Sequence, residues 1–432
     1  MRETLRKRAC MAHVVRALLV LSGVAPGPLA SARRDARGAP RAYRGSMRGA
    51  GGEPGGRGVP VRAASTTGLS SCARARYKAS AFALSSRMPS QPADSIRYDY
   101  PVAVIGGAGF VGSEAVRQLL AAGAGDVRVI DCQPLTGALA EDPAVRAFRR
   151  DIRTDDLREP LRGVKTVLHL AACQYHSPLA PTTYDLPFHA VNVEGTRRVL
   201  AASIAEHAAR LVFVSTNMVY GLPQALPIRE DHPKRPFGPY GRGKLEAEEL
   251  IRAAHDEGRI DAAVIRPCLI VGPGRTGVLT RVLEWILRDR PVALIGGGRN
   301  RYQMVAVEDC ARLVLLAGLD RGFAAYNCGS SDVPPMRRWV EEVARRAGSR
   351  SRVVNLPGAL VKPALAALEA VRLSPLRKDQ YLIADLDYIV DTTAARARLG
   401  WVPRYNDVDA ALQTFAWYIE HRNTARAAPV AS

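Results

Sequence analysis

The sequence predicts an α/β fold: a doubly wound parallel sheet followed by a smaller C-terminal α/β lobe. The first observation behind this prediction is that, beyond residue 100, short apolar runs alternate with longer amphipathic stretches. Such alternation is typical of parallel strands separated by helices. The second observation is size, because 432 residues, 47% hydrophobic and 24% charged, are enough for one large domain and a lobe.

Five apolar runs are expected to be strands: Val102–Ile105, Val127–Ile130, Val167–Leu170, Leu211–Val214 and Ala262–Ile265. Three amphipathic stretches are expected to be helices: Gly112–Ala122, Phe188–Ala205 and Tyr240–Ala254. Right-handed crossovers then place helices on both faces of the sheet. Ligands in such folds bind at the carboxyl ends of the strands, so we expect the functional residues to lie there.

A glycine-rich turn follows the first predicted strand and opens a helix. Its sequence, Gly106-Gly107-Ala108-Gly109-Phe110-Val111-Gly112, has the spacing G-x-x-G-x-x-G. Gly106 permits a tight turn, Gly109 lets the backbone approach a pyrophosphate, and Gly112 lets the helix pack closely on the strand. The helix N-terminus offers unpaired N–H groups to phosphate oxygens. The turn therefore predicts a dinucleotide-binding site.

One acidic residue indicates which dinucleotide is bound. Asp131 ends the next strand, 19 residues beyond Gly112. A carboxylate at this place accepts hydrogen bonds from the adenosine ribose and repels a 2′-phosphate. No Arg or Lys occurs in the following Cys132-Gln133-Pro134. We therefore predict NAD rather than NADP as the cofactor.

Tyr240 and Lys244 have the spacing Y-x-x-x-K at the start of a predicted helix, so they share one helix face. The Lys244 ammonium is expected to favour ionisation of the Tyr240 phenol, whose ordinary pKa is about 10. Tyr240 would then exchange a proton with an alcohol or a carbonyl. Thr216, after the fourth predicted strand, is expected to hydrogen-bond the reacting oxygen. Gly241 and Gly243 weaken this helix, which indicates close approach of substrate or backbone.

These motifs together resemble the extended short-chain dehydrogenase/reductase superfamily, in its NAD-dependent epimerase/dehydratase branch, typified by nucleoside-diphosphate-sugar 4-epimerases. The similarity runs from about Pro101 to about Tyr418 and includes a closing segment at Asp391–Pro403. It implies a Rossmann-type sheet and an NAD-dependent enzyme. It also implies three catalytic residues: Thr216, Tyr240 and Lys244.

The resemblance assigns most cofactor contacts to the ends of strands. Phe110 and Val111 would meet the pyrophosphate through their backbone, and Asp151-Ile152 would lie at the adenine. His169 and Asn192 match structural positions. The complete set implied for the cofactor is Gly106, Gly109, Phe110, Val111, Gly112, Asp131, Asp151, Ile152, Leu170, Ala171, Ala172, Tyr240, Lys244 and Pro267.

Two departures from the family pattern narrow the reaction. The 4,6-dehydratases carry an Asp-Glu pair directly after the catalytic threonine, and here these positions are Asn217 and Met218. Neither side chain performs acid–base chemistry. The position of Met218 is also where the sugar-acid decarboxylases carry a glutamate. Dehydration and decarboxylation are therefore disfavoured, which leaves an epimerase or a simple dehydrogenase.

A third departure concerns the substrate. Many sugar-nucleotide enzymes place a diphosphate-binding arginine a few residues before a V-x-D motif, here Val307-Glu308-Asp309, and Tyr302 stands at that position. Arg299 or Arg301 either replaces that arginine or is an ordinary surface residue. Thr216 and Asn217 are the other residues expected to meet the substrate. A nucleotide sugar is thus what the resemblance implies.

The domain boundaries are predicted from composition. Residues 98–275 should form the NAD-binding domain and 276–425 mainly the substrate-binding lobe, with segments that return to the sheet and a tail at 426–432. Residues 1–97 are expected to be a disordered basic extension, because residues 1–87 hold 17 Lys and Arg against 3 acids. A secretory signal, a transit peptide and a start at Met88 are the alternatives. We favour Met88 and a cytoplasmic enzyme.

Other partners follow from the same sequence. The net charge of +20 lies mainly in the extension, so nucleic-acid binding is not expected. We expect no membrane partner and, since no Cys/His cluster has metal spacing, no metal. The scattered cysteines, Cys132 among them, are expected to be buried free thiols. The family resemblance implies a homodimer through a four-helix bundle. The alternatives to an epimerase are a dehydrogenase of a steroid-like or isoprenoid alcohol and a non-catalytic NAD-binding scaffold.

Overall fold

The computed structural model describes residues 96–174, 186–275, 278–370, 374, 376 and 378–427. A seven-stranded sheet has the order β10-β6-β5-β4-β1-β2-β3, and every neighbouring pair is parallel. This is the predicted Rossmann-type doubly wound order. The strands are β1 (Val102–Ile105), β2 (Val127–Asp131), β3 (Val145–Arg149), β4 (Thr166–His169), β5 (Arg210–Val214), β6 (Asp261–Pro267) and β10 (Ala324–Cys328).

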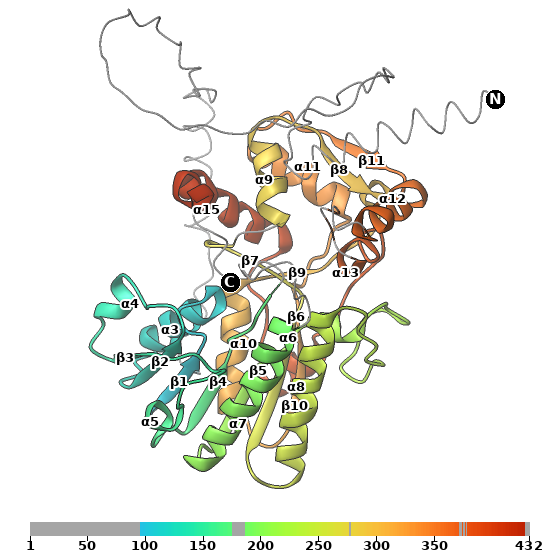
Figure 1. Cartoon of the computed structure of the whole chain (residues 1–432). Coiled ribbons are helices and arrows are strands. Elements are labelled where there is room, and N and C mark those ends of the chain that lie inside the picture. Colours follow the sequence, from blue (N-terminus) through green and yellow to red (C-terminus); the bar gives the residue numbers. More distant parts are fainter. Residues whose placement is uncertain are drawn as a thin grey trace, which may run out of the picture. The chain divides into compact units, whose positions relative to one another are not determined.

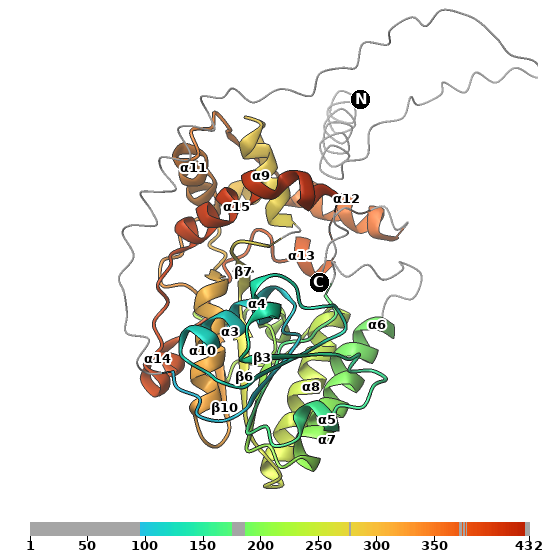
Figure 2. The ribbon, with the colours of Figure 1, turned by 90° about the vertical axis from the view of Figure 1, so that its left-hand side faces the viewer.

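Helices cover both faces of the sheet (Figures 1 and 2). One face is buried by α3 (Phe110–Ala121) and α10 (Val307–Leu319), which supply Leu119 and Leu313 to a core with the strands. The other face is buried by α5 (Arg158–Leu161), α7 (Thr196–Ala205) and α8 (Pro239–Asp256). Both faces of the sheet are therefore shielded from water, which explains why the central strands are mostly continuous apolar runs.

The five predicted strands are confirmed, although β4 begins and ends one residue earlier than expected. Two strands, β3 and β10, were not predicted. Both lie at the edges of the sheet, and β3 exposes Arg146 and Arg149. The arginines of β3 interrupt the apolar run that identifies a central strand, and charged edge strands are common because they discourage pairing with another chain. In β10, Asn327 shortens the apolar run.

The predicted helix Phe188–Ala205 is divided in the structure. It consists of α6 (Leu186–His189), a π-helical segment η2 (Ala190–Gly195) and α7. Gly195 lies where a Cβ would approach the Ile152 side chain to 2.6 Å, so η2 packs closely on the loop after β3. Such π-turns often occur at functional sites.

The C-terminal lobe is built on two short parallel pairs, β8 (Val292–Ile295) with β11 (Val353–Leu356) and β7 (Leu269–Val271) with β9 (Met304–Ala306). Its helices are α9 (Val278–Leu287), α11 (Met336–Arg346), α12 (Gly358–Ala370), α13 (Lys378–Tyr381) and α15 (Asp407–Ala427). The helix α14 (Thr393–Leu399) returns to the sheet, where buried Trp401 donates from its indole nitrogen to the Asp309 carbonyl. The small elements α4 (Ala138–Glu141), η3 (Asn217–Tyr220) and η4 (Gly296–Gly298) lie in connections.

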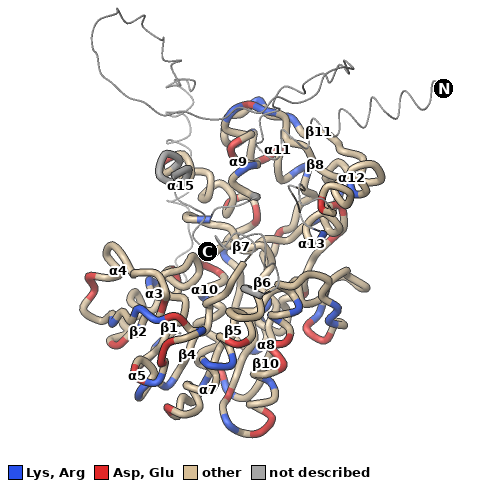
Figure 3. Tube along the Cα trace, viewed as in Figure 1, with Lys and Arg blue, Asp and Glu red and all other residues tan. Residues whose placement is uncertain are grey.

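Basic and acidic residues are interspersed along the described elements (Figure 3). The predicted extension lies outside the described residues except for its last two, Ile96 and Arg97, and most of the predicted tail lies outside them too. No helix in the described part of the chain has both the length and the apolarity that a bilayer span requires.

Candidate functional site

The phosphate loop connects β1 to α3. Gly106 has a φ of +85°, and a Cβ there would lie 2.5 Å from the Ala171 amide nitrogen. A Cβ on Gly112 would lie 2.0 Å from the Gly106 carbonyl oxygen. Helix α3 begins at Phe110 with no side-chain cap and no acidic residue in its first turn. Its first N–H groups are thus left for an anion, as the spacing predicted.

Asp131 lies at the end of β2, with its carboxylate held by backbone amides. Its Oδ2 accepts a hydrogen bond from Ala108 N at 3.0 Å, and its Oδ1 accepts one from Gln133 N at 2.9 Å. The carboxylate therefore lies beside the phosphate loop with lone pairs to spare for hydroxyl donors. The next residue, Cys132, is exposed, which corrects the expectation of a buried thiol: it follows the strand instead of lying in it.

The ends of β3 and β4 adjoin this loop. Asp151 binds the Arg153 guanidinium, which holds the pKa of the carboxyl below its usual range, while Ile152 is buried. Leu170 N and Ala171 N both donate to the Ile105 carbonyl, so the chain after β4 runs against Gly106. Ala172, the last residue predicted here, follows in the same segment.

Two polar residues brace the segment after β4. Asn192 accepts from Cys173 N at 2.8 Å and donates to the Cys173 carbonyl at 3.0 Å. His169 is fully buried, with Nε2 2.9 Å from the Thr196 hydroxyl. Burial, and to a lesser degree the Lys244 charge, lower the pKa of His169 to about 3, so its ring is neutral. These contacts suit the structural roles that the resemblance implied for both residues.

Thr216 follows β5, and Tyr240 and Lys244 lie on α8. Thr216 is close enough to Tyr240 to lower the pKa of its phenol, and its hydroxyl accepts a hydrogen bond from Met218 N at 3.2 Å. Lys244 is buried and donates from Nζ to the Val214 carbonyl at 2.7 Å. A Cβ on Gly241 would lie 2.8 Å from the Met218 carbonyl oxygen, so this glycine allows close approach of backbone.

The electrostatics of Tyr240 differ from the prediction. Burial raises the pKa of Tyr240 to about 12, and Arg275, with a smaller contribution from Thr216, opposes this rise. The cation that lowers the pKa is thus Arg275 where the sequence suggested Lys244, whose ammonium donates to the Val214 carbonyl and lies 4.3 Å from the centre of the Phe213 ring. Burial lowers the pKa of Lys244 to about 7.

A buried network of charges holds the end of β6, next to Pro267. The Arg266 guanidinium binds both carboxylate oxygens of Glu248 at 2.8 and 3.0 Å and donates to the Tyr220 hydroxyl at 2.9 Å. Tyr220 in turn donates to Asn327 on β10 at 2.7 Å. Sequence reasoning missed Glu248, although it lies four residues after Lys244 and therefore on the same helix face.

The residues expected to meet the substrate separate into two groups. Asn217 is buried beside Thr216, and its carbonyl accepts from the Tyr388 hydroxyl at 2.8 Å. Tyr302 packs on Tyr388, with ring centroids 5.9 Å apart. Arg301 instead binds Asp387 through its guanidinium at 3.2 Å. Arg299 is exposed. Tyr388, which the sequence did not single out, thus joins the site from a distant segment.

Comparisons with known proteins show to which family the chain belongs. The profile of the NAD dependent epimerase/dehydratase family matches residues 102–329. The chain belongs to this family. The dTDP-glucose 4,6-dehydratase of Streptomyces griseus is 30% identical over 74% of this chain and 94% of its own length. The UDP-glucose 4-epimerase of Mycolicibacterium smegmatis is 30% identical over 70% of this chain and 93% of its own length.

A solved structure extends the comparison to three dimensions. MoeE5 in complex with UDP-glucuronic acid and NAD is 26% identical, covers 76% of this chain and all of its own, and superposes with a TM-score of 0.61. Membership of this epimerase/dehydratase family makes the chain an enzyme and NAD its cofactor. The residues present fit NAD, because Gly106 and Gly112 admit no Cβ and α3 begins with no side-chain cap and no acidic residue in its first turn.

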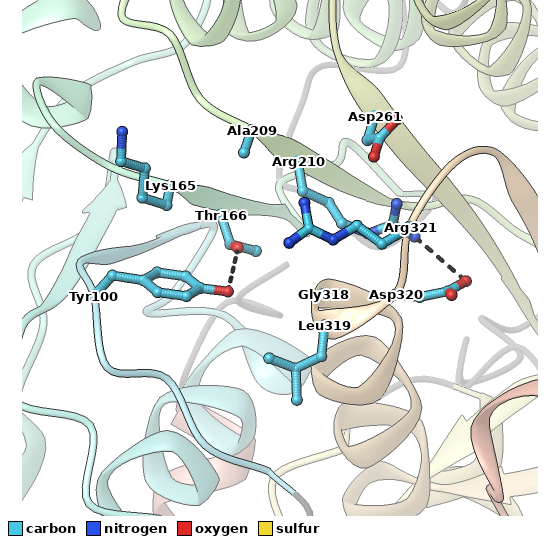
Figure 4. A pocket seen from close by; sticks show the side chains of 10 residues that line it. All are labelled: Tyr100, Lys165, Thr166, Ala209, Arg210, Asp261, Gly318, Leu319, Asp320 and Arg321. Atoms are coloured by element: carbon cyan, nitrogen blue, oxygen red, sulfur yellow. Dashed lines mark hydrogen bonds and ion pairs between the residues drawn. The ribbon is translucent and has the colours of Figure 1, made fainter.

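The described residues also form a pocket of about 230 Å³ elsewhere, at the amino ends of β4, β5 and β6 (Figure 4). Its lining residues include Lys165, Arg210, Asp261 and Asp320. These are the amino ends of the strands, whereas the residues predicted to bind NAD lie at the carboxyl ends. Arg210 donates there to the Ala317 and Gly322 carbonyls, which stabilises the end of α10. No group of three potential metal ligands occurs among the described residues.

Proposed function

We propose that this enzyme is an NAD-dependent epimerase that acts on a secondary alcohol carbon of a nucleoside-diphosphate sugar. The observation that carries the proposal is the pair Asn217-Met218 beside Thr216 and Tyr240. A dehydratase needs a second acid–base pair at these positions, and here an amide and a thioether occupy them. Reversible oxidation at one carbon is the chemistry that Tyr240 supports without further acids.

The roles of the chain's own residues follow from their geometry. NAD, when bound, accepts and returns the hydride. Tyr240 exchanges a proton with the substrate hydroxyl, and Thr216, which lowers the pKa of the Tyr240 phenol, would steady the same oxygen. Lys244 is buried beside the strand end where the nicotinamide ribose is expected, and its ammonium keeps donors for ribose hydroxyls. The phosphate loop, Asp131 and Asp151 would hold the adenosine half.

The substrate class is supported by the relatives. UDP-glucose 4-epimerases and dTDP-glucose 4,6-dehydratases occur among proteins up to 30% identical to this chain, and both act on nucleotide sugars by name. MoeE5 was solved with UDP-glucuronic acid. We extend that class to this chain, together with a homodimer through the α6–α7 and α8 region.

One observation favours a second candidate, a dehydrogenase of a less polar alcohol. Met218 and Phe237 contact the cluster that contains Tyr388, and Tyr302 packs there in the place of the family's arginine. This side of the site is therefore more apolar than we expect for a surface that binds a diphosphate. A steroid-like or isoprenoid alcohol would suit such a wall.

The proposal is tested by incubating the full-length protein with NAD and UDP-, dTDP- or GDP-sugars, and by following both sugar stereochemistry and NADH absorbance. We expect interconversion without net NADH, and a loss of about 10²- to 10⁴-fold in Tyr240→Phe. Tyr326→Phe is the matched control, because it removes a tyrosine hydroxyl bonded to Asp320, outside the site. Net NADH from a non-nucleotide alcohol would favour the dehydrogenase, and a dehydrated sugar would contradict both.

A further inference from the structure

Arg275 is a partly buried cation without a counter-ion in the described part of the chain. No carboxylate in the described residues forms an ion pair with it. Burial lowers the pKa of its guanidinium, and among the described residues only Tyr240 acts in the opposite direction. Arg266 shows the usual arrangement, because its buried guanidinium binds both oxygens of Glu248. A desolvated charge is costly unless it is paired. An unpaired one beside a ligand site therefore indicates an anionic ligand.

The backbone directs Arg275 to the phosphate loop. Arg275 N donates to the Gly272 carbonyl at 3.1 Å, which closes a turn, and Gly274 adopts a φ of +93° that favours glycine. A Cβ on either glycine would lie 3.6 Å from the Phe110 ring, so the turn wraps around that ring. The Arg275 guanidinium carbon lies 5.6 Å from the centre of the same ring.

Two neighbours show where the guanidinium acts. Phe110 is the first residue of α3, whose uncapped N-terminus is the expected pyrophosphate site. Tyr240 is the second neighbour, because the Arg275 charge lowers the pKa of its hydroxyl against the effect of burial. The guanidinium is therefore near both the first residue of α3 and the reacting tyrosine.

We propose that Arg275 is a diphosphate-binding residue whose guanidinium, held over the Phe110 ring, donates hydrogen bonds to phosphate oxygens of the bound ligand. Guanidinium is suited to this role, because its fixed fork of donors matches two phosphate oxygens at once. The diphosphate belongs either to NAD or to a nucleoside-diphosphate sugar. A nucleoside-diphosphate sugar as the ligand rests on the proposed function. In that case Arg275 would supply the positive charge of the family's diphosphate-binding arginine, whose position is occupied by Tyr302 in this chain.

The test measures binding, so it does not depend on turnover. Full-length Arg275→Ala and Arg275→Lys are titrated calorimetrically with NAD, and then, when saturated with NAD, with UDP and dTDP. Adenosine, which has no phosphate, is the ligand control. Arg290→Ala is the protein control, because it removes an exposed cation for which the structure shows no side-chain bond. Circular dichroism checks folding, and Arg275→Gln takes the place of the alanine variant if that variant unfolds.

We expect Arg275→Ala to weaken diphosphate binding about 10- to 100-fold and to leave adenosine binding unchanged, with partial recovery in Arg275→Lys. Weaker NAD binding would show that Arg275 binds the diphosphate of the cofactor. Weaker binding of UDP or dTDP would show that it binds the diphosphate of the substrate. If the wild type binds neither UDP nor dTDP, the NAD titration alone decides. Affinities within twofold of wild type for all diphosphates overturn the proposal. Full epimerisation by Tyr240→Phe would overturn the proposed function while leaving the NAD result intact.

Discussion

Two glycine-rich turns occupy similar places in the chain, each between a strand and the next element, and they obey different constraints. In the phosphate loop, the atoms that exclude a Cβ are backbone: Ala171 N at Gly106 and the Gly106 carbonyl at Gly112. In η4 of the lobe, three successive glycines have positive φ, and the nearest atoms are mostly side chains, such as Asn355 Oδ1 at 3.1 Å from a Cβ on Gly297. Backbone cannot move aside as a side chain can.

The difference explains why one turn is recognisable in the sequence. The phosphate loop must leave helix N–H groups open to a ligand while strand and helix pack in contact, and this requires glycine at fixed spacing. The lobe turn requires only left-handed backbone, which many glycine arrangements supply. Substitutions in each turn can therefore test whether its glycines are required for ligand binding or only for the stability of the fold.

The largest effect is expected from Gly112→Ala. The new methyl group would lie 2.0 Å from the Gly106 carbonyl oxygen and 2.7 Å from the Gly107 Cα, so α3 must move away from the loop. We expect NAD binding to be lost and the free energy of unfolding to fall by about 3 kcal/mol or more, as for overpacked cores. Calorimetric titration with NAD and urea unfolding measure the two effects.

Gly125→Ala is the matched control for this variant. Gly125 follows α3, has no positive φ, and a Cβ there would have no atom within 4 Å. It should bind NAD as the wild type does. Normal NAD binding by Gly112→Ala would show that the loop tolerates displacement, and the distinction between the two turns would then fail.

The fold was predictable largely because the central strands are buried on both faces. The apolar runs at Val102–Ile105 and Leu211–Val214 lie in the middle of the sheet, where all of their residues are buried. The edge strand β3 carries arginines at exposed positions and gives no such signal. The π-helical segment within the predicted helix Phe188–Ala205 was not predicted, and the close packing of its Gly195 on Ile152 involves a residue from another element.

The site was predictable where a local motif places a residue, and not where tertiary packing does. Tyr240, Lys244 and Thr216 lie together as the spacing suggested, although their catalytic roles stay a prediction. The direction of the Lys244 ammonium toward the Val214 carbonyl depends on how α8 packs on β5. Arg275 and Tyr388 reach the site from segments 35 and 148 residues beyond Tyr240 in the sequence, with no motif to mark them.

The next effect concerns the lobe and depends on pH. Asp407 is buried at the start of α15, and its carboxylate accepts from Met304 N on β9 at 3.3 Å. Burial raises the pKa of this carboxyl to about 7. The folded state therefore binds this proton more tightly than the unfolded state, so the contribution of Asp407 to stability is fully present below about pH 4 and is lost as the pH rises to about 7. The slope is at most about 1.4 kcal/mol per pH unit.

Asp407→Asn removes this titration, so the variant should gain free energy of unfolding relative to the wild type as the pH rises from 4 to 8. Urea unfolding at several pH values measures the gain. Burial also raises the pKa of Glu308 to about 7 and that of Asp309 to about 6, but these groups titrate in both proteins and cancel in the difference. Parallel stability curves would show that Asp407 stays ionised. NAD binding should not change, since β9 and α15 lie outside the loop.

The smallest effect is expected from Gly297→Ala, in the turn whose glycines we infer to serve the fold alone. Its φ of +74° costs an alanine about 1–2 kcal/mol, and the Asn355 side chain can turn away from the methyl group. Gly348→Ala has the same strain at φ +66° without any atom within 4 Å of the new Cβ, so it isolates the backbone cost. We expect the two variants to lose similar free energies of unfolding and to bind NAD normally. A loss of NAD affinity in Gly297→Ala alone would mean that the lobe turn, too, is shaped for the ligand.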